Sequence, residues 1–140
     1  MPIHESLLEI RQYTGKGYLP LVDFEAWRVA VLRYNEELLP QNIKTMQRHD
    51  ATDEVFVLLS GRCILFLGDG GDSVIDILAE DMEPLKLYNV KRGVWHTHTL
   101  STDATVLIVE NRDTTDMNSP EIFLSAEQHR QLIQLVQALW

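Results

Sequence analysis

The sequence has a single cysteine, few basic residues and no long apolar run, and each shortage excludes a class of protein. Cys63 alone cannot form an internal disulfide, and it lies in the apolar run CILFL, where a thiol usually behaves as a small buried hydrophobe. No stretch approaches the roughly 20 apolar residues that a membrane-spanning helix needs. The N-terminal MPIHESLLEIR has acidic residues where a signal peptide begins with basic ones, so we expect a cytoplasmic protein.

Basic side chains are the second shortage. The chain has 12 Lys and Arg against 21 Asp and Glu, which gives a formal net charge of −9. Proteins that bind nucleic acids or anionic lipid surfaces normally carry a clustered excess of Lys and Arg. We therefore expect no nucleic-acid partner and no membrane partner. The sequence also has no helix-turn-helix pattern that would indicate gene regulation.

What the sequence does contain is a series of short apolar and β-branched runs, separated by Gly, Pro, Asn and Asp. A length of 140 residues with 45% apolar content suits one core, so we expect a single domain over 1–140. The rhythm of runs and turns predicts an all-β sandwich or barrel, with its core at about 18–111. The predicted strands are Tyr18–Phe24, Trp27–Tyr34, Ile43–His49, Glu54–Leu59, Cys63–Leu67, Val74–Leu78, Lys86–Val90, Trp95–Leu100 and Thr105–Glu110.

Turn signals predict how some of these strands pair. Ser60–Gly61 predicts that the strands on either side of it form an antiparallel hairpin. The Gly-rich stretch 68–73 predicts a second hairpin, because its glycines permit the positive backbone angles of a tight reversal.

Helices are predicted only near the two ends of the chain. A short helix is expected over Glu5–Arg11, and a longer amphipathic helix over about 125–139. Ser125 and Gln128 form a capping box for the second helix, and its apolar residues fall on one face. We expect this face to pack on the outside of the barrel, with a subunit contact as the alternative.

Two segments place imidazole and carboxylate groups near one another. His49 ends one predicted strand and Glu54 begins the next, so a short turn can bring them together. His96 and His98 are two residues apart and therefore point to the same face of a strand. Two His and one carboxylate can bind Fe, Mn, Co, Ni or Zn and leave positions open for substrate. A His in a barrel is also often only hydrogen-bonded, so spacing leaves both possibilities open.

The first of these segments resembles the first motif of the cupin superfamily. That motif has His, any residue, His, three or four residues, Glu, six residues and Gly. The present chain has Gln47, His49, Glu54 and Gly61 at the corresponding places. Gln47 therefore stands where the family has its first His.

The second segment resembles the second cupin motif, which has Pro, any residue, Gly, two residues and His. Lys91, Gly93 and His96 occupy those places, with lysine instead of proline. The resemblance covers about 41–111, and it implies a cupin-type double-stranded β-helix, or jelly-roll barrel, with the C-terminal helix added.

The resemblance also implies site residues. His49, Glu54 and His96 take three of the family's four metal positions, and Gln47 takes the fourth with only a neutral amide oxygen to offer. His98, about 7 Å beyond His96 along the strand, is the candidate proton carrier, or only a hydrogen-bonded lining residue.

Three other charged residues are weaker candidates. Asp53 is next to Glu54, but adjacent strand residues face opposite sides, and the spacing to the motif glycine selects Glu54. Arg28 and Arg33 lie on opposite faces of one strand, so one of them can point inward and bind an anionic group, although a solvated outer face is the simpler expectation.

Two functions agree with these residues. The first is a metal-dependent cupin enzyme that acts on a small polar metabolite, such as a carboxylate or sugar derivative, with a divalent transition metal (Fe, Mn, Ni, Co or Zn) as Lewis acid. The second is a non-catalytic, metal-free cupin that binds a small molecule. The superfamily includes isomerases, epimerases, decarboxylases, lyases and dioxygenases, so the fold does not choose the reaction. Family analogy also implies a homodimer.

Overall fold

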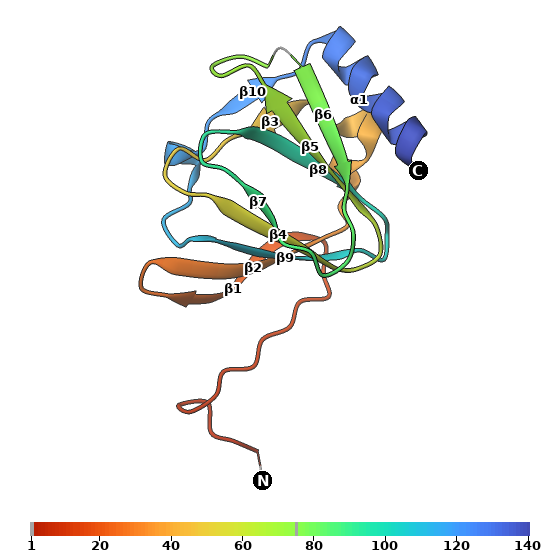
Figure 1. The fold of residues 1–140 in the computed structure, drawn as a ribbon. Helices are drawn as coiled ribbons and strands as arrows, with labels where there is room; N and C mark the ends of the chain where they lie inside the picture. Colours follow the sequence, from red (N-terminus) through yellow and green to blue (C-terminus); the bar gives the residue numbers. More distant parts are fainter. Residues whose placement is uncertain (1, 75) are drawn as a thin grey trace.

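The computed structural model of the chain describes residues 2–74 and 76–140 and contains two five-stranded antiparallel sheets that pack face to face (Figure 1). The first, which we call the β4 sheet, contains in spatial order β1 (Gly17–Phe24), β2 (Trp27–Arg33), β9 (Thr105–Asn111), β4 (Glu54–Ser60) and β7 (Tyr88–Val90). The second, which we call the β5 sheet, contains β10 (Glu121–Phe123), β3 (Thr45–Gln47), β8 (Trp95–Leu100), β5 (Cys63–Asp69) and β6 (Asp76–Asp81). This is the predicted jelly roll.

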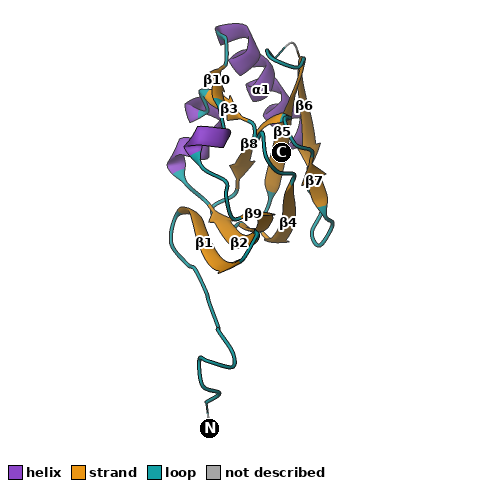
Figure 2. Ribbon diagram, turned by 90° about the vertical axis from the view of Figure 1, so that its left-hand side faces the viewer, coloured by secondary structure: helices purple, strands orange, loops and turns teal. Residues whose placement is uncertain are grey.

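Four helices complete the described part of the chain. Three are short 3₁₀ helices, η1 (Glu36–Leu38), η2 (Pro40–Asn42) and η3 (Asp116–Asn118), and the fourth is the α-helix α1 (Ala126–Leu139). Figure 2 shows α1 beside β6, outside the pair of sheets. None of the described helices is long and apolar enough to span a membrane.

All nine predicted strands are present, with boundaries that shift by a few residues. Trp95–Leu100 is identical to β8, whereas β3 and β7 are each shorter than predicted. Ile75, which the prediction put inside a strand, lies outside the described residues. The sequence analysis missed β10, which pairs with β3 within a stretch that lacks the usual alternation of apolar residues.

The predicted hairpin across Ser60–Gly61 is wrong. β4 pairs with β7 and β9, whereas β5 pairs with β6 and β8 in the other sheet. Gly61 has φ +72° and lies so close to Ala104 that a Cβ atom there would be 2.5 Å from the Ala104 Cα. The Arg62 N–H also donates to Ser101 Oγ at 2.8 Å. These contacts hold the turn against the β8–β9 connection, so the chain passes from one sheet to the other.

The second predicted hairpin is confirmed, and β5 explains why its sequence is continuously apolar. β5 pairs antiparallel with β6 across the Gly-rich stretch. Cys63 and Leu65 belong to the core between the sheets, whereas Ile64 and Phe66 belong to a second core on the other face. Burial raises the pKa of the Cys63 thiol to about 12, and the cysteine is buried as predicted.

The second core is covered by α1, as predicted. Ser125 accepts a hydrogen bond from the Gln128 N–H, and the Gln128 side chain accepts one from the Ser125 N–H, so the capping box is present. Leu132 is fully buried against the β5 sheet. The exposed end of the apolar stripe lies at Leu139 and Trp140, each 37% exposed.

The short helix predicted over Glu5–Arg11 is wrong. The segment makes a single turn, in which the N–H groups of Leu7 and Leu8 donate to the His4 carbonyl. The chain before β1 extends away from the two sheets (Figures 1 and 2). Without an apolar surface to pack on, a helix of one or two turns is not stable in water.

Candidate functional site

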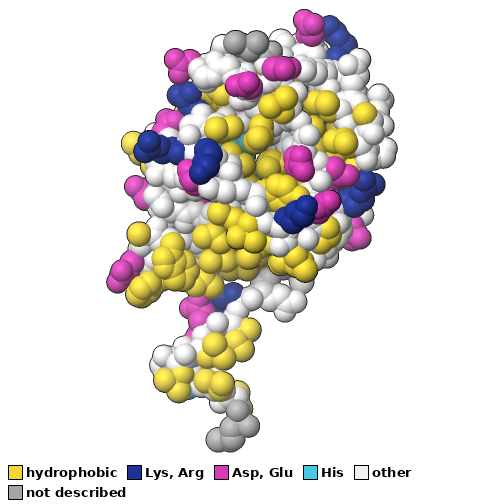
Figure 3. All heavy atoms as spheres, viewed as in Figure 1, with side chains coloured by type: hydrophobic (Ala, Val, Ile, Leu, Met, Phe, Trp, Pro, Cys, Tyr) yellow, Lys and Arg dark blue, Asp and Glu magenta, His cyan; other side chains and the backbone are white. Residues whose placement is uncertain are grey.

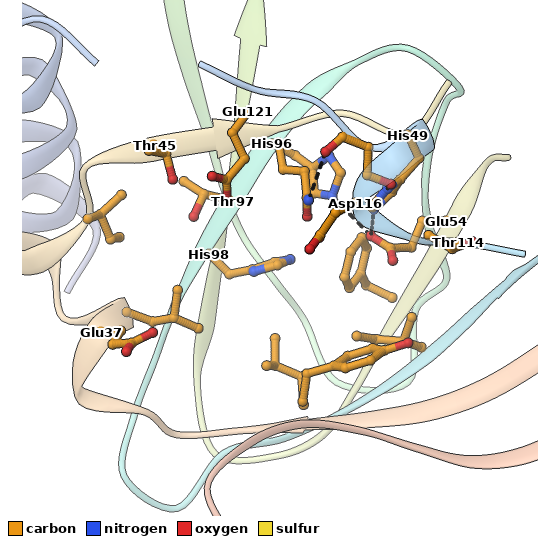
Figure 4. A pocket seen from close by; sticks show the side chains of 18 of the residues that line it. Glu37, Thr45, His49, Glu54, His96, Thr97, His98, Thr114, Asp116 and Glu121 are labelled. Atoms are coloured by element: carbon orange, nitrogen blue, oxygen red, sulfur yellow. Dashed lines mark hydrogen bonds and ion pairs between the residues drawn. The ribbon is translucent and has the colours of Figure 1, made fainter. Parts of the chain in front are cut away.

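A cavity of about 840 Å³ opens between the two sheets at one end of the barrel. The β4 sheet contributes Glu54 and Glu110 to its lining, and the β5 sheet contributes Gln47, His96 and His98. The connections before β3 and before β10 close part of its circumference (Figure 4). The cavity therefore collects side chains from segments far apart in the sequence.

Strand alternation puts Glu54 in the interior. β4 alternates buried and less buried residues, so Glu54, Phe56 and Leu58 share the inward face. The register pairs Val55 with Val109, which places Glu54 opposite Glu110 on the neighbouring strand. Two acidic residues thus lie side by side, next to the apolar residues Phe56 and Ile108 of the same inner face.

Two histidines point at the Glu54 carboxylate (Figure 4). The Oε1 atom of Glu54 lies 3.0 Å from Nε2 of His96 and 3.3 Å from Nε2 of His49. One ligand atom from each of the three residues can be chosen so that all lie within 4.8 Å of one another. The three side chains are buried, with residue exposures of 5 to 8%.

Backbone contact fixes the tautomer of His96. Its Nδ1 atom lies 3.0 Å from the Val94 carbonyl oxygen. A carbonyl can only accept a hydrogen bond, so Nδ1 carries the hydrogen. In the neutral ring, Nε2 therefore has a lone pair, and this lone pair faces Glu54.

A series of hydrogen bonds fixes the tautomer of His49 in the same way. Its Nδ1 lies 2.7 Å from Ser119 Oγ, which itself donates to Asn118 Oδ1 at 3.2 Å. The Asn118 amide is oriented because its oxygen accepts from the Thr115 N–H and its nitrogen donates to the Asp113 carbonyl. Ser119 therefore accepts from His49 Nδ1–H, and Nε2 of His49 also presents a lone pair to Glu54.

Three electron pairs thus converge on one point. Burial raises the pKa of Glu54, but a proton on the facing Nε2 atoms of His49 and His96 lowers it by more and holds that pKa below its usual value. An ionised carboxylate and two imidazole lone pairs repel one another unless a proton or a cation lies between them. The donor set, two imidazole nitrogens and one carboxylate oxygen, suits a divalent transition metal.

Glu110 stands behind this cluster and was missed by the sequence analysis. Burial and the neighbouring Glu54 carboxylate raise the pKa of Glu110 to about 8, and the Tyr18 hydroxyl donates to its Oε1. The signal was available, because alternation along Thr105–Glu110 puts Glu110 on the same face as Val106 and Ile108. Ser119 was missed as well, and its irregular segment gives no comparable signal.

His98 lies in the same cavity. Its ring centroid is 4.8 Å from that of Phe56 and 5.9 Å from that of His96, so the predicted shared face of the two histidines is confirmed. Its Nε2 atom is buried and has no hydrogen-bond partner among the described residues. Burial lowers the pKa of His98 to about 3, so the ring is neutral at pH 7. Thr97, between the two histidines in the strand, also borders the cavity.

Gln47 is part of the cavity lining and lies opposite His96 in the β3–β8 pairing. Its Nε2 donates to the Ser119 carbonyl at 3.1 Å, so its amide oxygen stays available for another contact. Its role as a fourth metal ligand stays a prediction.

None of the three weaker candidates lines the cavity, although Arg28 lies opposite Glu110 in the β2–β9 pairing. Asp53 accepts hydrogen bonds from the Arg92 N–H at 2.8 Å and the Asn89 side chain at 3.1 Å, which confirms that it faces away from Glu54. Arg28 pairs with Asp23, and the Arg33 side chain donates to Thr105 and to the Gly15 carbonyl. Neither arginine is among the residues that line the cavity.

Comparison with known proteins finds likeness in structure and not in sequence. No protein-family model and no curated protein matches the chain. A structure of Pac13, described as a nucleoside dehydratase, is 10% identical with a TM-score of 0.55 and covers 84% of this chain and 89% of its own. A Streptomyces PAC13 variant with uridine is 12% identical, with a TM-score of 0.56 and coverage of 86% and 98%.

A third similar structure is described as a cupin. It is a cupin-2 domain containing protein from Shewanella frigidimarina, 15% identical with a TM-score of 0.50, and it covers 77% of this chain and 88% of its own. Likeness at such low identity concerns the fold, and the two five-stranded sheets agree with it. The chain is therefore a protein of the cupin fold, a jelly-roll barrel with a C-terminal helix.

Proposed function

We propose that the chain is a metal-dependent cupin enzyme that acts on a small polar metabolite. In this proposal His49, Glu54 and His96 hold a divalent transition metal, and Gln47 is available as a fourth ligand. The observation that carries the proposal is the pair of fixed tautomers, because both histidines present Nε2 lone pairs to one carboxylate oxygen. A metal-binding histidine typically donates a hydrogen bond from its other ring nitrogen, as the Nδ1 atoms of His49 and His96 do here.

A bound divalent ion would supply Lewis-acid polarisation of a substrate oxygen. The residues around it have roles that follow from their contacts. Ser119 and the Val94 carbonyl orient the two rings, and the Tyr18–Glu110 contact supports Glu54 from behind. His98 faces the same cavity, and its Nε2 has no partner in the described part of the chain, so it can accept a hydrogen bond or a proton from a bound molecule.

The alternative function is a metal-free cupin that binds a small molecule without changing it. Gln47 favours this alternative, because an amide oxygen is a weaker metal ligand than an imidazole nitrogen. The cavity of about 840 Å³ is large enough for a nucleoside or a sugar. A PAC13 variant, which shares the fold, is known with uridine.

The two functions are separated by measuring bound metal. We would purify the untagged protein, offer Fe, Mn, Co, Ni and Zn in turn, and determine bound metal by elemental analysis. The wild type is expected to bind near-stoichiometric metal, His96→Ala is expected to lose it, and Gln47→His is expected to bind more tightly. His4→Ala, on the exposed N-terminal segment, is the control and should match the wild type.

A wild type that stays free of every metal while Gln47→His binds one would reject the enzyme and favour the binding module. Where metal is bound, the loaded protein is screened by NMR for conversion of small polar metabolites. Conversion that disappears in His96→Ala supports the enzyme, and binding without conversion supports the alternative.

A homodimer stays part of the proposal. Several large apolar side chains are exposed on the N-terminal segment and on the β1–β2 hairpin, among them Leu7, Ile10, Phe24 and Trp27. Figure 3 shows apolar side chains gathered over this part of the molecule. Exposed apolar area of this kind is where a second copy would be expected to pack, and light scattering would measure the oligomeric state.

A further inference from the structure

The cavity that holds the His49–Glu54–His96 cluster has strongly acidic walls. Among the described residues that line it, six are acidic, one is a lysine and none is an arginine. The acidic residues are Glu36, Glu37, Glu54, Glu110, Asp116 and Glu121, and the basic residue is Lys44.

Three of these acids already have partners. Glu54 belongs to the proposed metal site with His49 and His96, Glu110 accepts a hydrogen bond from Tyr18 and has a raised pKa, and Glu36 forms an ion pair with Lys16. We therefore do not assign these three acids to the recognition of a further group on the ligand.

The other three acids are different. Glu37, Asp116 and Glu121 come from η1, η3 and β10, and none of them forms an ion pair with the described residues. Figure 4 shows their carboxylates on different sides of the space around His98. They form an acidic rim, by which we mean these three residues, around a cavity that also contains a buried nitrogen without a partner, His98 Nε2.

Charge complementarity decides which molecules enter such a cavity. Carboxylates that line a concave surface raise the local concentration of cations and repel anions, because the low-dielectric walls focus the field. The net charge of −9 acts in the same direction. Thr45 and Thr97 lie near Glu121 in the lining, so hydroxyl groups on the ligand also have partners within the cavity.

We propose that the cavity selects a small organic cation, a compound that carries a protonated amine together with hydroxyl groups, whose amine is attracted by the combined negative charge of the acidic rim of Glu37, Asp116 and Glu121. The inference deepens the proposed function, since it rests on that function for where the reacting end of the molecule lies. It narrows the small polar metabolite to an amino-sugar type of compound and disfavours a carboxylate.

Three sugars of similar size and different charge test the proposal: glucosamine, glucose and glucuronate. Each is titrated into the protein, and amide resonances of the cavity residues are followed by NMR. Glucosamine is expected to bind roughly tenfold more tightly than glucose, the combined effect of several partly exposed charge pairs, and glucuronate to bind most weakly. The triple variant Glu37→Gln, Asp116→Asn, Glu121→Gln should remove the preference.

The matched control changes three exposed acids outside the cavity, Glu80→Gln, Glu83→Gln and Glu127→Gln, and should keep the preference. Equal binding of glucosamine and glucuronate, or no shift of the cavity amides by any of the three sugars, overturns the proposal. Mg²⁺ that shifts the rim amides while glucosamine does not also overturns it, because the acids would then collect metal ions.

The outcome is separate from that of the metal measurement. If the wild type binds no metal but prefers glucosamine, the proposed enzyme is rejected and the cation-selective cavity stands. If metal is bound and the preference is missing, the enzyme stands and the substrate class is rejected.

Discussion

The two ends of the barrel interior differ sharply although the same strands build both. On β4, Phe56 and Leu58 are buried in an apolar core, whereas Glu54, two residues before Phe56 on the same face, is buried among histidines. On β9, Val106 and Ile108 are core residues, whereas Glu110 is hydrogen-bonded to Tyr18. On each strand, a step of two residues separates an apolar core side chain from a buried ionisable side chain.

This difference shows how the fold can contain a group of buried polar side chains that is itself destabilising. Buried carboxylates and imidazoles cost free energy unless each has a partner, whereas the apolar end gains free energy from burial. The apolar end therefore stabilises the sheets, and the sheets hold the polar end in place. Changes at the apolar end should alter stability, and changes at the polar end should alter binding and pH dependence.

Leu58→Ala should give the largest effect on stability. Leu58 is 1% exposed, so the substitution should lower the free energy of unfolding by about 2–5 kcal/mol through lost burial and a cavity. Urea unfolding at pH 7 measures the change. Leu59→Ala, at the next position and 46% exposed, should change it by less than about 1 kcal/mol. Equal effects of the two variants would contradict the proposed apolar core.

Ser119→Ala should lower the affinity of the polar end for a metal without lowering the stability of the apolar core. The substitution removes the hydroxyl that holds His49 Nδ1, so the affinity for the proposed metal should fall roughly 10- to 100-fold while the unfolding midpoint of the metal-free protein changes little. Competition with a chelator measures the affinity. Ser73→Ala, in the exposed β5–β6 loop, is the control. An unchanged affinity in Ser119→Ala would mean that His49 needs no such support.

His98→Gln should reduce the pH dependence of stability. The pKa of His98 is lowered from 6.5 to about 3 in the folded chain, so the unfolded state binds more protons between these values. Stability is then lost as pH falls through this window, by at most about 1.4 kcal/mol per pH unit.

Urea unfolding of the metal-free protein at pH 7 and pH 5 tests this sign. The wild type should lose more stability between the two pH values than His98→Gln, and the exposed control His4→Gln should behave as the wild type does. The same loss in all three proteins would show that His98 is not buried as a neutral ring.

Sequence patterns predicted the strands better than their partners. Alternation and turn residues located β8 to the residue, because those signals are local. The failed hairpin at Gly61 shows the limit, since a tight turn between two apolar strands suits both a hairpin and a crossing between sheets. The contacts with Ala104 and Ser101, more than 30 residues away in the chain, decide which occurs.

The candidate site shows the same division. The motif spacing selected His49, Glu54 and His96, and the structure brings their ligand atoms together. Spacing did not reveal the Ser119 contact that fixes the His49 tautomer, because Ser119 reaches the site from an irregular segment after β9. It also did not reveal the rim acids Asp116 and Glu121, which lie in the same part of the chain.

By itself the sequence determined that Glu54 and not Asp53 faces inward, that His96 and His98 share a face, where the C-terminal helix begins, and which side chains have the chemistry to bind a metal. These properties follow from local periodicity and residue type. Only the tertiary structure decided which strands share a sheet, which tautomers the histidines take, and which charges surround the cavity. Those properties depend on contacts between residues far apart in the chain, and no local pattern encodes them.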